Sequence, residues 1–110
     1  MSQRVKKHAC DLYYLSKAKP TVCKAIIEKA DNSLICCICE CAQNILHGKV
    51  PLEQHEKRNL AKHKDNLRQL IKKSVPIAKK KRIIQQGGFL SALLAPLASM
   101  VVPLVSKLFK

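Results

Sequence analysis

The sequence has little of what a β-sheet protein or a base-stacking protein needs. Three glycines occur in 110 residues, with two tyrosines, two phenylalanines and no tryptophan. No alternating run of β-branched residues bounded by turn pairs is present, so strands are not expected. Proteins that stack single-stranded bases use aromatic side chains as platforms, and the shortage of aromatics argues against that class. Helix is therefore the expected structure.

Acidic residues are also scarce. Seven Asp and Glu residues face 21 Lys and Arg residues, which gives a formal net charge of +14. A compact domain with this charge repels itself, so the imbalance predicts a polyanionic partner. Nucleic acid and anionic lipid are the two classes of partner that fit.

The charge divides the chain into three zones, with net charges of +3 over residues 1–48, +9 over 49–82 and +2 over 83–110. We therefore expect a thiol-rich helical bundle at 1–48, a basic helical segment at 49–86 and an apolar, membrane-seeking tail at 87–110. The predicted fold class is all-α, a small helical bundle with a basic helix and an apolar C-terminal helical tail.

Three helices are predicted in the first zone, at residues 5–17, 22–30 and 34–46. Pro20 suits the first turn of the second helix. Asp31, Asn32 and Ser33 are good N-cap residues for the third, and Gly48 suits its C-cap. Because the third helix is apolar almost all round, we expect it at the centre of the bundle.

Six cysteines occur, and four of them lie on the predicted helix 34–46: Cys10, Cys23, Cys36, Cys37, Cys39 and Cys41. No secretory signal peptide is predicted after the charged N-terminus, which favours a reducing compartment and thiols. Zinc needs ligands that converge tetrahedrally, usually from two separate knuckles, and one helix cannot supply them. Two alternatives stay open: a disulfide formed after release from the cell, and a zinc site completed by Cys10, Cys23 or His47. No metal or cofactor is predicted.

The second zone carries the predicted polyanion-binding site. A helix is expected from Val50-Pro51-Leu52-Glu53 to about Lys73, followed by a short basic helix at 77–86. Phosphate contacts need charge and reach, so binding should be independent of base sequence and sensitive to salt. The predicted phosphate-binding residues are Lys57, Arg58, Lys62, Lys64, Arg68, Lys72, Lys73, Lys79, Lys80, Lys81 and Arg82.

The third zone contains 18 uncharged residues, 89–106, followed by Lys107 and Lys110. This length is at the lower edge of a membrane span, and Pro96 and Pro103 would kink a helix there. Membrane activity is the favoured interpretation, while a core helix and a transmembrane anchor stay open. The predicted membrane residues are Phe89, Leu90, Leu93, Leu94, Leu97, Val101, Val102, Leu104, Leu108 and Phe109.

The four histidines, His8, His47, His55 and His63, show no serine, cysteine or carboxylate arrangement in the sequence that would build a nucleophilic or acid–base site. We therefore interpret them as solvated or core-edge residues and predict that the protein is not an enzyme.

Four short motifs carry a resemblance to a known family. They are CECAQNIL at 39–46, GKVPL at 48–52, HKDNLRQL at 63–70 and KRIIQQGGFL at 81–90. Over residues 20–105 the chain resembles the small basic virion proteins of Polinton (Maverick) elements and adintoviruses, a family similar to the adenovirus core protein X (mu) precursor. The resemblance implies a minor virion component that helps to condense the genome.

The resemblance also implies processing by a viral cysteine protease after Gly87-Gly88. Such proteases require an aliphatic residue at the fourth position before the cut, and Gln85 departs from that pattern.

The expected function is thus a minor virion core or capsid protein, found in the virion and in the host nucleus during assembly. Its expected partners are double-stranded DNA, bound non-specifically, and an anionic membrane or a capsid protein, bound through the tail; an oligomer stays open. The alternative is a pore-forming or antimicrobial-type effector that targets anionic lipid.

Overall fold

All regular structure in the described part of the chain is helical. The computed structural model describes residues 3–86, 89–90, 92–96, 103 and 105–106. Within these residues no strand occurs, which confirms the all-α prediction. The helices are α1 (Gln3–Lys7), α2 (Ala9–Lys17), α3 (Pro20–Glu28), α4 (Asn32–Leu46), α5 (Gln54–Ala61), α6 (Lys64–Ile71) and α7 (Ile77–Gln86), and residues 90 and 92–96 are also helical.

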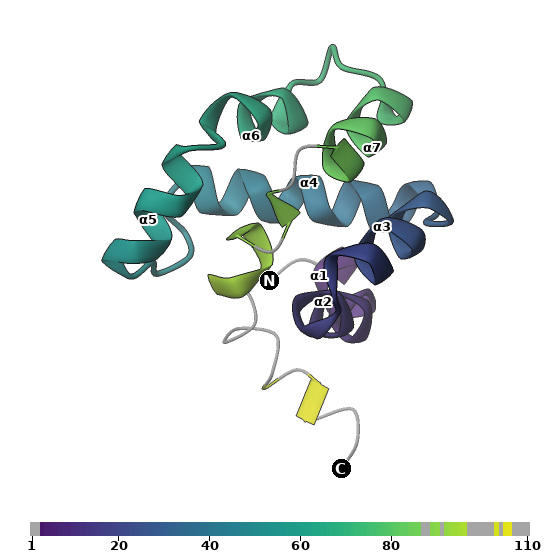
Figure 1. Cartoon of the computed structure of the whole chain (residues 1–110), viewed down its shortest axis with the longest axis horizontal. Helices are drawn as coiled ribbons and strands as arrows, with labels where there is room; N and C mark the ends of the chain where they lie inside the picture. The colour runs from purple at the N-terminus through teal and green to yellow at the C-terminus, as the bar shows by residue number, and fades with distance from the viewer. Residues whose placement is uncertain (1–2, 87–88, 91, 97–102, 104, 107–110) are drawn as a thin grey trace.

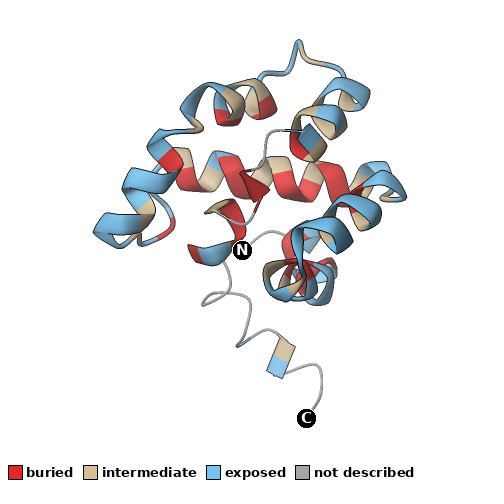
Figure 2. Cartoon of the chain, in the orientation of Figure 1, coloured by how far each residue is buried: buried red, intermediate tan, exposed pale blue. Residues whose placement is uncertain are grey.

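Helix α4 is the centre of the fold. It crosses the middle of the molecule in Figure 1 and contacts α1, α6 and α7, while α3 packs against α7. Figure 2 shows buried residues along much of its length. The prediction of a central helix is confirmed, because seven of its side chains are buried: Leu34, Ile35, Cys37, Ile38, Cys41, Ala42 and Ile45.

Both ends of α4 are capped as the sequence predicts. The Asp31 carboxylate accepts a hydrogen bond from the Leu34 N–H at 2.9 Å. At the other end, the N–H of Gly48 donates to the Ile45 carbonyl and that of Lys49 to the Asn44 carbonyl. This pair of bonds is the Schellman motif, which requires a left-handed residue, and Gly48 has φ +72°.

Two predicted helices are interrupted in the structure. The helix predicted over 5–17 is divided into α1 and α2 at His8, whose φ and ψ are −101° and 16°. The helix predicted up to Lys73 is divided into α5 and α6 at Lys62 and His63. Each break falls beside a histidine that makes tertiary contacts, and a 3.6-residue pattern alone does not report such contacts.

The first helix of the basic segment begins at Gln54, later than the predicted start at residues 50–53. Glu53 is the N-cap of α5 rather than a first-turn residue, and it forms a capping box with Glu56. The Glu53 N–H donates to the Glu56 carboxylate at 2.9 Å. Pro51 therefore lies before the helix. The predicted helix at 77–86 coincides with α7.

The chain folds back to the core after α7. Phe89, Leu90, Leu93 and Leu94 belong to the same buried cluster as the residues of α4. The Phe89 ring lies 5.8 Å from the His63 ring, measured between ring centres. One hydrophobic core thus contains side chains from all three sequence zones. The radius of gyration is 13.0 Å, close to the ~13 Å of a compact domain of about 100 residues.

Candidate nucleic-acid interface

The predicted phosphate-binding residues lie on three helices and the turns next to them. Helices α6 and α7 contact each other and both contact α4. Figure 1 shows α5 and α6 consecutive along one side of the molecule, with α7 beside them. Nine of the eleven predicted side chains are exposed and define what we call the cationic surface: Lys57, Arg58, Lys62, Lys64, Arg68, Lys72, Lys73, Lys79 and Arg82.

Helix geometry divides the four consecutive basic residues of α7 into two pairs. Ile84 is the buried residue of this helix, and Lys80 and Lys81 flank it at helical spacing, so both are half-buried. Lys81 donates a hydrogen bond to the Ala30 carbonyl at 3.3 Å, just beyond the C-terminus of α3. A cation is favourable there because the carbonyl end of a helix carries negative partial charge. Lys79 and Arg82 point away and are exposed.

The side chains of the cationic surface form no ion pairs, although Glu53, Glu56 and Asp65 lie on or beside α5 and α6, two of the same helices. All seven Asp and Glu side chains lie within the described residues, and none comes within 4.0 Å of a cationic-surface nitrogen. The ion pairs among the described residues involve other side chains: Arg4 with Glu40 at 3.8 Å, His8 with Asp11, and His55 with Glu53 at the start of α5. Unpaired, solvated cations are free to meet phosphate oxygens, whose contacts need charge and reach only.

The narrow apolar faces of the same helices hold the cationic surface on the core. Leu60 of α5, Leu67 and Leu70 of α6 and Ile84 of α7 are buried. His63 and Ile71, which lie at helical spacing from Leu60, Leu67 and Leu70, are half-buried. Because one face is fixed, the charged face keeps a defined orientation toward solvent.

The cysteines of α4 are free thiols in a mostly apolar setting. Cys37 and Cys41 are buried, and Cys36 and Cys39 are half-buried. Burial raises the pKa of Cys39 to about 11. A hydrogen bond between Cys37 and Cys41 lowers the pKa of Cys37 and, together with burial, raises that of Cys41. The raised pKa values make the Cys39 and Cys41 thiols poor nucleophiles at neutral pH, and buried Cys37 and Cys41 occupy the positions of small apolar packing residues.

The other two cysteines lie on other helices. Cys10 is exposed, and Cys23 is half-buried with its pKa raised by burial. Within the described residues, no group of three or more His, Cys, Asp or Glu side chains converges to hold a metal ion.

Part of the predicted membrane tail lies in the core. Of the ten predicted membrane residues, Phe89, Leu90, Leu93 and Leu94 are buried. For these four the structure shows the core-packing alternative, and membrane contact would require them to leave the core. The other six, Leu97, Val101, Val102, Leu104, Leu108 and Phe109, lie outside the described residues, as do Gly87 and Gly88. No described helix has the length and apolar character of a bilayer span.

The structure corrects one interpretation of the histidines. His8 is buried, and its ring is bonded on both sides: Nδ1 lies 3.1 Å from an Asp11 carboxylate oxygen, and Nε2 lies 2.8 Å from the Ser33 hydroxyl. The sequence suggested no such arrangement, because Ser33 is 25 residues away from His8. The one available signal was local: Asp11 follows His8 by three residues, one helical turn.

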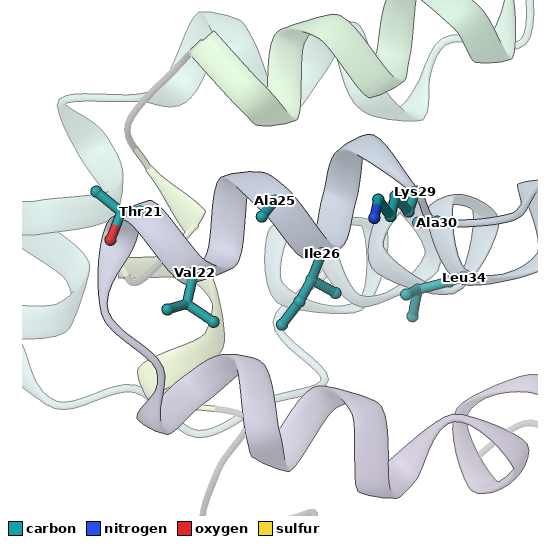
Figure 3. Close-up of a pocket in the computed structure, with 7 residues that line it drawn as sticks. All are labelled: Thr21, Val22, Ala25, Ile26, Lys29, Ala30 and Leu34. Carbon is teal, nitrogen blue, oxygen red and sulfur yellow. The ribbon is translucent and has the colours of Figure 1, made fainter.

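An apolar groove of about 610 Å³ runs along α3. Figure 3 shows its lining, in which Val22, Ile26 and Leu34 point in the same direction. Ala30 and Leu34 belong to this lining, and Leu34 directly follows Ser33 in the chain. One end of the groove is thus one residue along the chain from Ser33, while His8, Asp11 and Ser33 are not among its lining residues.

Comparisons with family models, curated proteins and solved structures found no match to this chain.

Proposed function

We propose that the protein binds double-stranded DNA non-specifically through the cationic surface of α5, α6 and α7. The observation that carries this proposal is the set of nine exposed Lys and Arg side chains without a carboxylate within 4.0 Å. Such a surface releases condensed counterions from DNA when it binds, which gives affinity without base readout. The scarcity of aromatic side chains fits binding to a duplex better than binding to stacked single strands.

The rigid attachment of the surface supports the same proposal. Leu67 and Leu70 anchor α6 in the core, so the charges of this helix are displayed on folded backbone rather than on a flexible tail. Preorganised charges lose less conformational entropy on binding than charges on a disordered segment. We further propose that the net charge of +14 allows several copies to neutralise and condense a genome.

The biological setting in this proposal is a virion of an adenovirus-like element, with accumulation in the host nucleus during assembly. It rests on the four short motifs that resemble the Polinton and adintovirus proteins. In the same proposal the apolar tail contacts a capsid protein or an anionic membrane. Mass spectrometry of purified particles tests both points: we expect the chain among the minor components, and recovery of only full-length chain would exclude processing after Gly88.

The test of DNA binding compares two charge reversals of equal size. Lys79→Glu with Arg82→Glu removes two cations from the cationic surface, and Lys6→Glu with Lys7→Glu removes two exposed cations from α1. At 0.15 M salt we expect the first pair to weaken binding to a 30-base-pair duplex roughly 30-fold or more. Each lost phosphate contact removes about 0.9 from the slope of log K against log salt. The α1 pair should weaken DNA binding less than about fivefold, since it acts only through long-range charge.

Equal losses of DNA affinity for the two pairs of substitutions would contradict a defined interface.

Anionic vesicles give a further comparison. Leakage of phosphatidylserine vesicles at protein concentrations that leave DNA unbound would support the membrane effector instead.

A further inference from the structure

His8 is the buried polar residue that the apolar core has to accommodate. It is 6% exposed, while the rest of the buried set in the described residues is hydrophobic. Burying an imidazole is costly unless its nitrogens are bonded. Both are bonded here, one to a carboxylate and the other to a hydroxyl.

The order of these bonds determines which way protons can move. An ionised carboxylate only accepts hydrogen bonds, so Nδ1 carries the ring proton and donates a hydrogen bond to Asp11. The lone pair of Nε2 then faces the Ser33 hydroxyl at 2.8 Å, and that hydroxyl donates to it. This is the polarity of a serine–histidine–carboxylate relay, in which the base activates the hydroxyl and the acid fixes the tautomer.

Ser33 also lies beside two backbone donors that have no partner in the described residues. It is the second residue of α4, and the first four N–H groups of a helix lack intrahelical acceptors. Asp31 satisfies one of these groups, because its carboxylate accepts from the Leu34 N–H. The Ile35 N–H donates to the Asp31 carbonyl, which is the first regular hydrogen bond of the helix. The N–H groups of Asn32 and Ser33 are left to stabilise a negatively charged oxygen that forms next to the Ser33 hydroxyl.

The α3 groove supplies a neighbouring apolar surface, since one of its lining residues is Leu34, which directly follows Ser33 in the chain. Val22, Ala25 and Ile26 line it, and it extends to Leu34. Its volume, about 610 Å³, is that of a small-ligand site. An acyl chain is the ligand chemistry that this lining favours.

We propose that Ser33, His8 and Asp11 form a nucleophilic site that hydrolyses carboxylic esters with a short or medium acyl chain. The Ser33 oxygen forms a bond to the acyl carbon while Nε2 of His8 takes the hydroxyl proton. His8 returns that proton to the alcohol as the ester C–O bond breaks. Water then attacks the acyl-serine while His8 takes its proton. His8 returns that proton to the Ser33 oxygen as the bond between this oxygen and the acyl carbon breaks, which releases the carboxylic acid and restores the serine. Ester and water are consumed, and acid and alcohol are produced.

In this scheme Ser33 and His8 are catalytic residues, and Asp11 is a positioning residue that acts through His8. The site lies on α2, α4 and the junction before α2, away from the cationic surface. Its failure would leave the DNA-binding proposal unaffected, and the reverse also holds.

The test uses the full-length protein and a fluorophosphonate probe. A serine activated by a histidine attacks the phosphorus, forms an O–P bond and expels fluoride, whereas ordinary serines do not react. We expect one adduct per chain by intact mass, located at Ser33 by peptide mapping, and none at Ser16 or Ser74 in the same sample. Esters of p-nitrophenol with two to eight acyl carbons measure turnover, and we expect Val22→Asp to remove any preference for the longer chains.

The variants separate chemistry from folding, because the same hydrogen bonds also tie α2 to α4. Ser33→Ala should abolish labelling. His8→Gln keeps one donor and one acceptor for the two partners but removes the base, so labelling should fall roughly 100-fold or more. Asp11→Asn should slow labelling roughly tenfold, and Asp11→Glu should restore part of the rate.

Circular dichroism and thermal unfolding accompany each variant. Absence of labelling in the folded wild-type chain would overturn the proposal. Labelling that persists in a folded His8→Gln variant, or that appears equally at other serines, would overturn it as well.

Discussion

Helix α4 and the basic helices α6 and α7 are neighbours in the fold, but they meet solvent in opposite ways. Helix α4 carries one charged side chain, Glu40, and buries seven residues. Helix α6 buries two residues and α7 buries one, and together they expose most of their Lys and Arg side chains. The width of the apolar stripe explains the difference. A helix that is apolar all round is stable only at the centre of the fold, whereas a helix with a narrow apolar stripe packs on the surface of the core.

The comparison also separates two kinds of contribution. Residues of α4 contribute to stability through burial and close packing. Residues of the cationic surface contribute charge to a partner and little to the fold, because exposed charges interact weakly in water. Substitutions in the two regions should therefore affect different properties, stability in one and binding in the other.

The largest effect is expected for Phe89→Ala. Phe89 is 0% exposed and packs between the core and His63 of the basic segment. Truncation of a buried phenylalanine costs about 3–5 kcal/mol in free energy of unfolding because a cavity remains. Urea unfolding measures the change, and Tyr14→Ala, at a site that is 58% exposed, is the matched aromatic control. An effect of Phe89→Ala no larger than that of the control would mean that this segment is not part of the core.

The next effect concerns pH and the thiols of α4. Burial raises the folded pKa of Cys39 from 9.0 to about 11. The stability linked to the protonated thiol is therefore fully present below pH 9 and is lost as the pH rises toward 11, because the unfolded thiol ionises first. We expect the free energy of unfolding to fall between pH 8.5 and pH 11, and to fall less steeply in Cys39→Ala. Identical slopes for the two proteins would remove Cys39 as the cause.

A smaller effect is expected at Gly48, which connects α4 to the basic segment. Its φ of +72° is strained for a side-chain-bearing residue, although a Cβ would meet nothing within 4 Å. Gly48→Ala should therefore cost about 1 kcal/mol through backbone strain alone. Gly48→Asn should cost less, since asparagine tolerates this conformation. Thermal unfolding of both variants measures which one is less stable, and an equal loss of stability would argue against the left-handed conformation of Gly48.

The smallest effect distinguishes two lysines of α7. Lys81→Gln removes a hydrogen bond to the Ala30 carbonyl, whereas Lys79→Gln removes an exposed charge only. Both variants lower the net charge equally, so their difference reports the hydrogen bond, for which about 0.5–1.5 kcal/mol is expected. For DNA binding the order should reverse, with Lys79→Gln the more harmful. The same order in both measurements would contradict the division of α7 into two pairs.

Much of the secondary structure followed from local patterns. Asp31, Gly48 and Pro20 mark helix ends by their own backbone chemistry, and α7 has the limits that its flanking Pro76 and the glycine pair suggest. The all-round apolar pattern of residues 34–46 identified the central helix. The breaks at His8 and His63 were not predicted, because they coincide with contacts to Ser33 and Phe89, which are distant in the chain.

The sequence by itself determined the helical class, the central place of α4 and the strong positive charge, because composition and periodicity act locally and need no partner. Only the tertiary structure decided that Phe89 and Leu93 are core residues, that Lys80 and Lys81 face inward while Lys79 and Arg82 face solvent, and that His8 meets both Asp11 and Ser33. Burial and proximity depend on which helices pack together, and the contact of His8, just before α2, with Ser33 at the start of α4 depends on the fold of the whole chain.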